Sequence, residues 1–318
     1  MTELFDVICI GAALVDMVAQ VERHPLDDDE VFVSDLKLLS GGAAANTAYT
    51  CAKIGLSSAF LGKLGKNDVF GAKIIEDFTQ VNVNTTLIKY SEHYGTGSAY
   101  VALNKEGDRR IYAHSGAANY LSKEDVIEDE IKTSKIIFLS SLKNLEPFIE
   151  AAKLGRKNGI PVILNPGMLI IDQGLNNILE LLKNIDIFIL SQREFTTLLN
   201  IKEKIEEKNL REKADVLLTY GIKALIITMG EKGAFLFSNN NSELIPSMKI
   251  EDVIDTTGAG DAFSAGFIYG FAKNLNFEFS NLKRNVEIGN FVAGKCIQQL
   301  GARNGIPTYE EVKQIILP

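Results

Sequence analysis

Residues 255–263 (DTTGAGDAF) combine a carboxylate with small residues, just before an apolar stretch that predicts a helix over 262–273. Small residues let the backbone turn sharply and approach a ligand closely. The first N–H groups of a helix have no intrahelical partner, and the helix dipole favours an anion there. Asp261 would repel a phosphate that was merely held at this place. The pattern therefore predicts phosphoryl transfer to a hydroxyl, with Asp261 as the base and backbone donors that stabilise the developing charge.

This nine-residue stretch resembles the second signature of the PfkB, or ribokinase-like, family of sugar and nucleoside kinases. Residues 61–71 (LGKLGKNDVFG) resemble the first signature, and other matching segments occur in the family's order between residues 6 and about 307. The plain alternative is a glycine-rich helix start without catalytic function. That alternative would suit Gly-x-Gly alone better than nine residues with Asp on both sides.

The resemblance implies ATP as phosphoryl donor, Mg²⁺ as its metal and Asp261 as general base. Backbone donors for the transferred group are then Gly258, Ala259 and Gly260. It also implies a monovalent cation such as K⁺ at the positions of Asp255 and Thr257.

Polar residues also follow the first predicted strand. The apolar run 5–14 is typical of a buried parallel strand, and Asp16 follows it at the end where open α/β sheets bind ligands. On position alone, Asp16 is equally a turn or cap residue. Residues 40–48 (SGGAAANTA) predict either an open pocket wall or a small-residue helix packed on the sheet. The resemblance implies that the acceptor sugar is bound by Asp16, Gly41, Gly42 and Asn46, and that Asn165, which could equally be a turn residue, lines the site.

The nucleotide side of the resemblance lies in the second half of the chain. Thr228, Gly230 and Gly233 match a segment that lines the nucleotide phosphates, and Thr257 of the glycine motif is assigned to the nucleotide as well. Asn290, on a predicted helix over 286–300, corresponds to a contact with the base, although it could equally be a buried polar residue of that helix. Glu194 matches a residue that acts on Mg²⁺ through water, but the family's Asn three positions earlier is Ser191 here.

The acceptor is the least determined part of the function. Ribokinases typically carry Lys where this chain has Ala43, and Glu in the segment that is Ser140 to Lys143 here. These losses favour a ribonucleoside such as adenosine or inosine, as in archaeal nucleoside kinases of the family. A free sugar (ribose, fructose or 2-keto-3-deoxygluconate) is the alternative, and a non-catalytic sugar- or nucleotide-binding regulator is a further one. A P-loop NTPase is excluded by the lack of a Walker A pattern, and a dehydrogenase is disfavoured by the lack of GxGxxG after the first strand.

These residues require an α/β fold to position them. We expect one domain over residues 1–318, with a mainly parallel sheet, helices on both faces and a small β lid from about 17–39 and 95–115. The resemblance implies both the lid and the order of the sheet. Strands are expected near 136–139, 162–164, 187–190 and 224–228, a helix over 145–157, a hairpin turn at 239–241 and a solvated charged face over 202–213.

Composition indicates which partners and which cellular location to expect. The formal charge of −8 and pI of about 5.1 argue against a nucleic-acid surface. Cys9, Cys51 and Cys296 are far apart and predict buried free thiols, and the three histidines lack metal-ligand spacing. The first residues lack the charge pattern of a signal peptide and no apolar stretch could span a bilayer, so we expect a cytoplasmic protein without a membrane partner. The sequence leaves the oligomeric state open; the resemblance implies a homodimer through the lid as one option, with strands over 31–39 and 97–113 as its edges.

Overall fold

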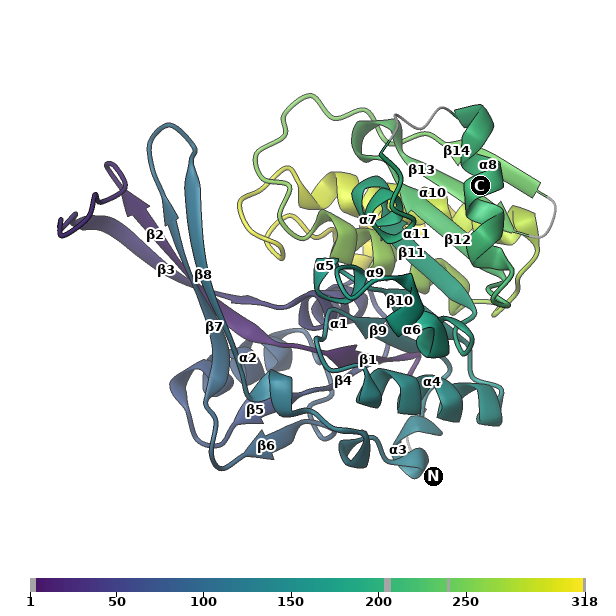
Figure 1. The fold of residues 1–318 in the computed structure, drawn as a ribbon, viewed down its shortest axis with the longest axis horizontal. Coiled ribbons are helices and arrows are strands. Elements are labelled where there is room, and N and C mark those ends of the chain that lie inside the picture. Colours follow the sequence, from purple (N-terminus) through teal and green to yellow (C-terminus); the bar gives the residue numbers. More distant parts are fainter. Residues whose placement is uncertain (1–3, 203–206, 239–240, 317–318) are drawn as a thin grey trace.

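The computed structural model describes residues 4–202, 207–238 and 241–316. Its main sheet has eight strands in the order β14-β13-β12-β11-β10-β9-β1-β4 (Figure 1). The strands from β12 to β4 run parallel, whereas β13 and β14 are antiparallel additions at one edge. Their bounds are β1 Val7–Gly11, β4 Ser58–Leu61, β9 Ile137–Ser140, β10 Val162–Asn165, β11 Ile187–Ser191, β12 Ala224–Thr228, β13 Ala234–Ser238 and β14 Asn241–Ile245.

Apart from the edge strand β14, the strands of this sheet are buried on both faces, because successive side chains point to opposite sides and helices cover each side. In β1, Val7 and Cys9 join one apolar core, and Ile8 and Ile10 join the other. The first core is closed by α1 Ala43–Lys53, α2 Val69–Gln80, α9 Ala259–Phe271, α10 Phe279–Cys296 and α11 Tyr309–Ile316. The second is closed by α3 Glu128–Ile131, α4 Glu146–Asn158, α5 Met168–Ile171, α6 Leu175–Leu182, α7 Gln192–Leu198 and α8 Glu207–Leu218.

A separate four-stranded sheet projects from the main body (Figure 1). Its order is β3-β2-β7-β8, with β2 and β7 parallel and the two outer pairs antiparallel. The bounds are β2 Leu14–Val21, β3 Val33–Gly41, β7 Thr96–Leu103 and β8 Arg109–Gly116. The expected sheet exists, but each half extends to the main body, starting at residue 14 and ending at residue 116 rather than near 17 and 115.

The first predicted strand was wrong in its length. The apolar run 5–14 is interrupted at Ala12 and Ala13, and Leu14 already pairs with Gly41 and Gly97 in the second sheet. Two helices were also misplaced. The helix expected over 262–273 is Ala259–Phe271, because the small residues of the motif adopt helical geometry, and that expected over 286–300 is Phe279–Cys296. The expected hairpin turn includes residues 239–240, and the charged stretch includes residues 203–206, which lie outside the described residues.

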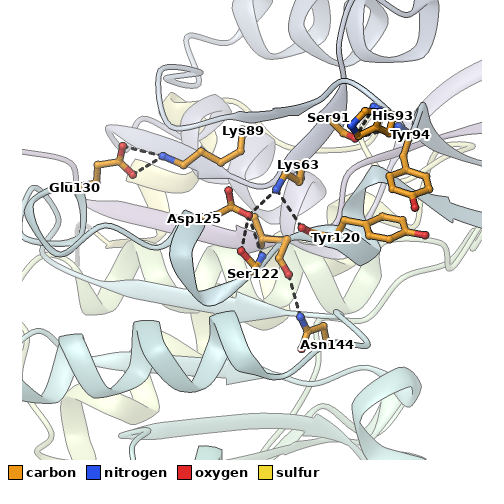
Figure 2. Close-up of polar contacts among 11 residues, drawn as sticks. Lys63, Lys89, Ser91, His93, Tyr94, Tyr120, Ser122, Asp125, Glu130 and Asn144 are labelled. Atoms are coloured by element: carbon orange, nitrogen blue, oxygen red, sulfur yellow. Dashed lines mark hydrogen bonds and ion pairs between the residues drawn. The ribbon is translucent and has the colours of Figure 1, made fainter.

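The chain returns from the second sheet through two short 3₁₀ helices, η1 Ala117–Tyr120 and η2 Lys123–Asp125; a third, η3 Gly230–Lys232, follows β12. Figure 2 shows what holds this return. Lys63, on the short strand β5 Lys63–Gly65, binds the carbonyl of Tyr120 at 3.1 Å and Asp125 at 2.8 Å. Lys89, on its neighbour β6 Lys89–Ser91, contacts both oxygens of Glu130 at 2.9 Å. These contacts fix the base of the second sheet to the main body.

Asp68 ties that base to α2. Its Oδ1 accepts the N–H of Gly71 at 2.6 Å, as the N-cap of α2, and its Oδ2 accepts the N–H of Thr96, the first residue of β7, at 2.6 Å. Thr96 is buried, so no solvent replaces this acceptor if the carboxylate is lost.

We therefore expect Asp68→Ala to lower the free energy of unfolding by about 2 kcal/mol, because a cap is lost and a buried N–H is left unpaired. Urea unfolding measures this loss. Asp68→Asn is the matched control. Its single carbonyl oxygen keeps one of the two hydrogen bonds, so the free energy of unfolding should fall by only about half as much as in Asp68→Ala. Equal stability of Asp68→Ala and the parent chain would contradict this account.

Candidate active site

The N-terminus of α9 is the centre of the site. Gly258 is its N-cap, with φ of 77°, and a Cβ there would lie 2.4 Å from the Cβ of Ala302. Only glycine meets both demands without strain. The N–H of Ala259 donates to the carbonyl of Thr256 at 3.2 Å, while no hydrogen bond between described residues uses the N–H of Gly258 or Gly260. The helix start thus presents free donors and the positive end of its dipole.

Asp261 lies in the first turn of α9 beside α1. Its Oδ2 accepts a hydrogen bond from Nδ2 of Asn46 at 2.9 Å. Burial raises the pKa of Asp261 to about 7; the bond from Asn46 and the charge of Arg303 lower it, and the charge of Glu194 raises it further. A carboxylate that gains and loses its proton near neutral pH suits a general base.

The glycine pair Gly41-Gly42 brings β3 into α1. Gly42 has φ of 95°, and a Cβ on it would meet the carbonyl of Ala12 at 2.4 Å. A Cβ on Gly41 would lie 2.5 Å from Oδ2 of Asp16, so the carboxylate of Asp16 rests on this glycine. One helical turn later, α1 presents Asn46 to Asp261. The four predicted acceptor residues Asp16, Gly41, Gly42 and Asn46 are therefore brought together.

Asp16 belongs to β2 of the second sheet, where it pairs with Leu39 and Ala99. The expectation that it follows a main-sheet strand, as a turn or ligand-binding residue, was wrong in its element. Burial raises the pKa of Asp16, and the charge of Arg303 opposes that shift. A half-buried carboxylate on the second sheet, facing the glycine pair, is suited to accept hydrogen bonds from hydroxyls.

The loop before α9 is organised by Asp255. Its Oδ1 accepts the N–H and the hydroxyl of Thr257 at 2.9 and 2.7 Å, and its Oδ2 accepts the N–H of Gly301 at 2.8 Å. Burial raises the pKa of Asp255, but these bonds outweigh it and leave the pKa below its ordinary value. Asp255 and Thr257 thus lie together, as expected, and join the motif to the loop after α10.

A cavity of about 750 Å³ opens on the other side of the α9 N-terminus, a volume in the range of ligand pockets. It is lined by six of the residues assigned from sequence to the phosphates or nucleotide: Thr228, Gly230, Gly233, Ala259, Gly260 and Asn290. Thr256 rather than Thr257 lines it. Sequence reasoning missed the loop between β14 and the motif and an apolar wall, which contribute Ser247, Met248, Lys249, Ile250, Glu251, Val253, Phe263, Ala293, Gly294 and Ile297.

Three predicted residues have structural bonds of their own. The amide of Asn290 donates to the carbonyls of Ile245 and Pro246 at 3.2 and 3.0 Å, so its donors are used while the residue still lines the cavity. Asn165, at the end of β10, donates to Ser264 on α9 at 3.0 Å. Glu194 forms a capping box with Ser191 at the start of α7: its N–H donates to the hydroxyl of Ser191 at 3.2 Å, and its side-chain hydrogen bonds to described residues use Oε2.

Arg303, in the segment between α10 and α11, is a buried residue of this site that sequence reasoning missed. Its Nε donates to Oδ1 of Asn46 at 2.9 Å. An arginine seven residues after the end of α10 gives no local signal of burial, because its partner lies 257 residues away in the sequence. The only sequence hint is its place beside Gly301 and Ala302, at the end of the region that resembles the family.

Cysteine and metal expectations can be compared with these positions. Cys9, Cys51 and Cys296 are buried free thiols, as predicted. Over residues 4–202, 207–238 and 241–316, the structure places no three His, Cys, Asp or Glu side chains where they could hold a metal ion together. In the same residues, no helix has the length and apolar character needed to cross a bilayer.

Comparison with known proteins agrees with this arrangement. The ribokinase of Staphylococcus aureus (strain COL) is 31% identical over 312 residues, covering 97% of this chain and 99% of the relative. The solved structure of Arabidopsis thaliana ribokinase complexed with ribose and ATP has a TM-score of 0.86 at 25% identity, covering 99% of both chains. The Methanocaldococcus jannaschii nucleoside kinase, at 24% identity and a TM-score of 0.81 over 99% of both chains, shares the fold.

The fold and site define a phosphotransferase that acts on an alcohol group of a sugar or nucleoside. Residues 4–309 match the model of the pfkB family of carbohydrate kinases, and the chain belongs to this family. The ribokinase-like fold, with its mostly parallel sheet and small separate sheet, is confirmed.

Substitutions at two glycines of the motif should have different effects, one on ligand binding and the other on stability. A Cβ on Gly260 would meet no atom within 4 Å and would project into the open cavity. We expect Gly260→Ala to leave the free energy of unfolding unchanged or raise it by up to about 1 kcal/mol, because alanine favours the helix. KM for ATP should rise roughly tenfold, a loss of about 1.4 kcal/mol of binding.

Gly258→Ala is the comparison, since its positive φ and contact with Ala302 should lower the free energy of unfolding by about 2 kcal/mol. Denaturant unfolding and steady-state kinetics of both variants measure the difference. A loss of stability in Gly260→Ala would contradict the open space beside its Cα. An unchanged KM for ATP would show that Gly260 does not border the nucleotide.

Proposed function

We propose that the protein transfers the γ-phosphoryl group of ATP to a hydroxymethyl group, with a ribonucleoside such as adenosine or inosine as the first candidate acceptor. The observation that carries the proposal is Asp261, bound by Asn46 between the acceptor residues and the 750 Å³ cavity. The carboxylate and the free N–H groups of the α9 start lie at the boundary of two binding regions, where the transferred group must pass.

In the proposed reaction, Asp261 accepts the proton of the acceptor hydroxyl while the oxygen of that hydroxyl forms a bond to the γ-phosphorus. The bond to the bridging oxygen breaks, and ADP leaves with that electron pair. The N–H groups of Gly258, Ala259 and Gly260 stabilise the transferred group, although the N–H of Ala259 must exchange its weak bond to Thr256. Asp16, Asn46 and the backbone of Gly41 and Gly42 hold the sugar.

Metal ions have plausible donors in these residues. Mg²⁺ neutralises the phosphates of bound ATP, and oxygen donors are its preferred ligands. Glu194 fits a role through water, because its side-chain hydrogen bonds to described residues use Oε2 and its charge acts on Asp261. For K⁺, the carbonyls of Thr257 and Ala302 are the relevant donors, because among the described residues they receive only long contacts from the thiol of Cys296, at 3.8 and 3.5 Å, next to the bonded carboxylate of Asp255.

We further propose that the second sheet is a lid within a single kinase domain. It carries Asp16 and meets the main body at the acceptor residues, so its closure would exclude water, which competes as phosphoryl acceptor. The homodimer through the lid stays a prediction. It is supported by the exposed apolar side chains of Leu36, Leu38, Ile111 and Tyr112 on the outer strands.

The identity of the acceptor rests on two segments. Ala43 starts α1 beside Gly42, and Ser140 ends β9 and is followed by Ser141, so these two segments lack the Lys and the Glu that are typical of ribokinases. The similarity to ribokinases keeps a free sugar (ribose, fructose or 2-keto-3-deoxygluconate) as the alternative. A non-catalytic regulator is disfavoured because the carboxylate and the glycine motif are both intact.

The first prediction for this proposal concerns Asp261. Asp261→Asn should lower kcat at least roughly a hundredfold while ligand binding persists, because the amide keeps the size but cannot accept the proton. For the parent protein, kcat/KM should fall below about pH 7, since protonation of Asp261 removes the base. Initial rates from pH 5 to 9 measure both effects. Unchanged turnover in Asp261→Asn would rule out Asp261 as the base.

A second prediction concerns the acceptor. With ATP and Mg²⁺, turnover should be highest for a ribonucleoside when adenosine, inosine, guanosine, cytidine, ribose, fructose and 2-keto-3-deoxygluconate are compared at equal low concentration. Ala43→Lys is the matched variant and should shift preference toward a free sugar. Turnover with a free sugar alone would contradict the nucleoside assignment and leave the kinase intact.

A further inference from the structure

Arg303 is the buried cation beside the two acidic residues of the site. The residue is only 9% exposed. Its Nε donates to Oδ1 of Asn46 at 2.9 Å, and Nδ2 of Asn46 donates to Oδ2 of Asp261 at 2.9 Å. A continuous chain of two hydrogen bonds therefore runs from the guanidinium through the amide to the carboxylate.

The direction of this chain is fixed by chemistry. A guanidinium has donors and no acceptor, so the amide of Asn46 must turn its oxygen toward Arg303. Its NH₂ group must then face Asp261. The bond from Asn46 occupies Oδ2 of Asp261, which leaves Oδ1 for the proton of an acceptor hydroxyl. Without Arg303, the amide could rotate and would present its oxygen to the carboxylate.

Two aromatic faces and one carboxylate surround the charge of Arg303. Its Cζ lies 4.8 Å from the ring centre of Tyr49 and 5.7 Å from that of Phe78. The nearest carboxylate oxygen, on Asp77, is 3.8 Å from Nη1, and neither Nη1 nor Nη2 has a hydrogen-bond partner among the described residues. Burial lowers the pKa of Arg303 to about 10, so it remains charged at neutral pH. Its charge is thus only partly neutralised and acts on its surroundings.

That charge acts on both acidic residues of the site. Burial raises the pKa of Asp261 and of Asp16, and Arg303 opposes the shift in each. The remaining charged groups near Asp261 do not replace it. Glu194, at the start of α7, raises the pKa of Asp261, and burial raises the pKa of Cys296 on α10 to about 12, so that this thiol is uncharged.

We propose that Arg303 is a positioning residue of the phosphoryl transfer: it orients Asn46, through it the carboxylate of Asp261, and places a buried positive charge near Asp16 and Asp261. The inference rests on the proposed role of Asp261 as general base. Arg303 itself contacts no reacting atom.

Two variants separate the hydrogen bond from the charge. Arg303→Met removes both, and we expect kcat to fall roughly tenfold to a hundredfold. The decrease of kcat/KM toward low pH, here called the acid limb of the pH profile, should also shift to higher pH by about one unit. Arg303→Gln can still donate to Asn46, so it should recover most of kcat but keep the shifted limb. Lys89→Met is the control, because it removes a partly buried cation paired with Glu130, away from the site, and should leave the limb in place.

Asp77→Asn tests the sign of the effect. It removes the carboxylate nearest to Arg303 without touching Asn46, so more of the charge acts on Asp261 and the acid limb should move to lower pH. Opposite shifts in Arg303→Met and Asp77→Asn would support the proposal. Lower stability of Arg303→Met with an unmoved limb and unchanged kcat would overturn it, since that pattern describes a residue that only packs.

The assay also includes Asp261→Asn. If that variant keeps full turnover, the general base is misassigned and the proposed function fails in that part. If it is inactive while both Arg303 variants behave like the parent protein, only the inference about Arg303 is overturned. Should Arg303→Met not fold, Arg303→Gln decides the question, because an unshifted limb in that variant contradicts the role of the charge.

Discussion

The hydrogen bond between Asn46 and Asp261 is the contact on which the site depends, since it joins residues 215 positions apart in the sequence. It requires that α1 and α9 pack against each other on the same face of the main sheet. It also requires both helices to start with glycine, because Gly42 and Gly258 have positive φ and close backbone neighbours. The sheet supplies the surface, and the two glycines set where each helix begins.

Burial and charge are balanced around this contact. A carboxylate is costly to bury, and the raised pKa of Asp261 expresses that cost. The α9 N-terminus, the amide of Asn46 and the guanidinium of Arg303 together offset it, so that the group titrates near neutrality instead of being permanently protonated. A carboxylate with this balance is suited to accept a proton and to release it again, as the proposed role of Asp261 requires.

The sequence allowed the class of fold and most of the site to be predicted, because local patterns carry them. The strand Ala224–Thr228 agrees with its apolar run, and the glycine motif indicated the start of α9 to within three residues. The run 5–14 misled because its apolar character is continuous across a change of sheet at Ala12 and Ala13, and pairing partners are not visible in one segment. Arg303 was missed for the same physical reason: its burial depends on Tyr49, Phe78 and Asn46, which come from distant elements.

Because Arg303 lies near the end of the fold, it is synthesised long after the residue that it contacts. Asp16 and Asn46 leave the ribosome early, whereas Asn46 meets Arg303 only after a further 257 residues have been made. At about 5–20 residues per second, this interval is at least about 13 s. A nascent chain therefore carries Asp16 and Asn46 well before the complete set of groups around Asp261. The groups around Asp261 are thus complete only near the end of synthesis.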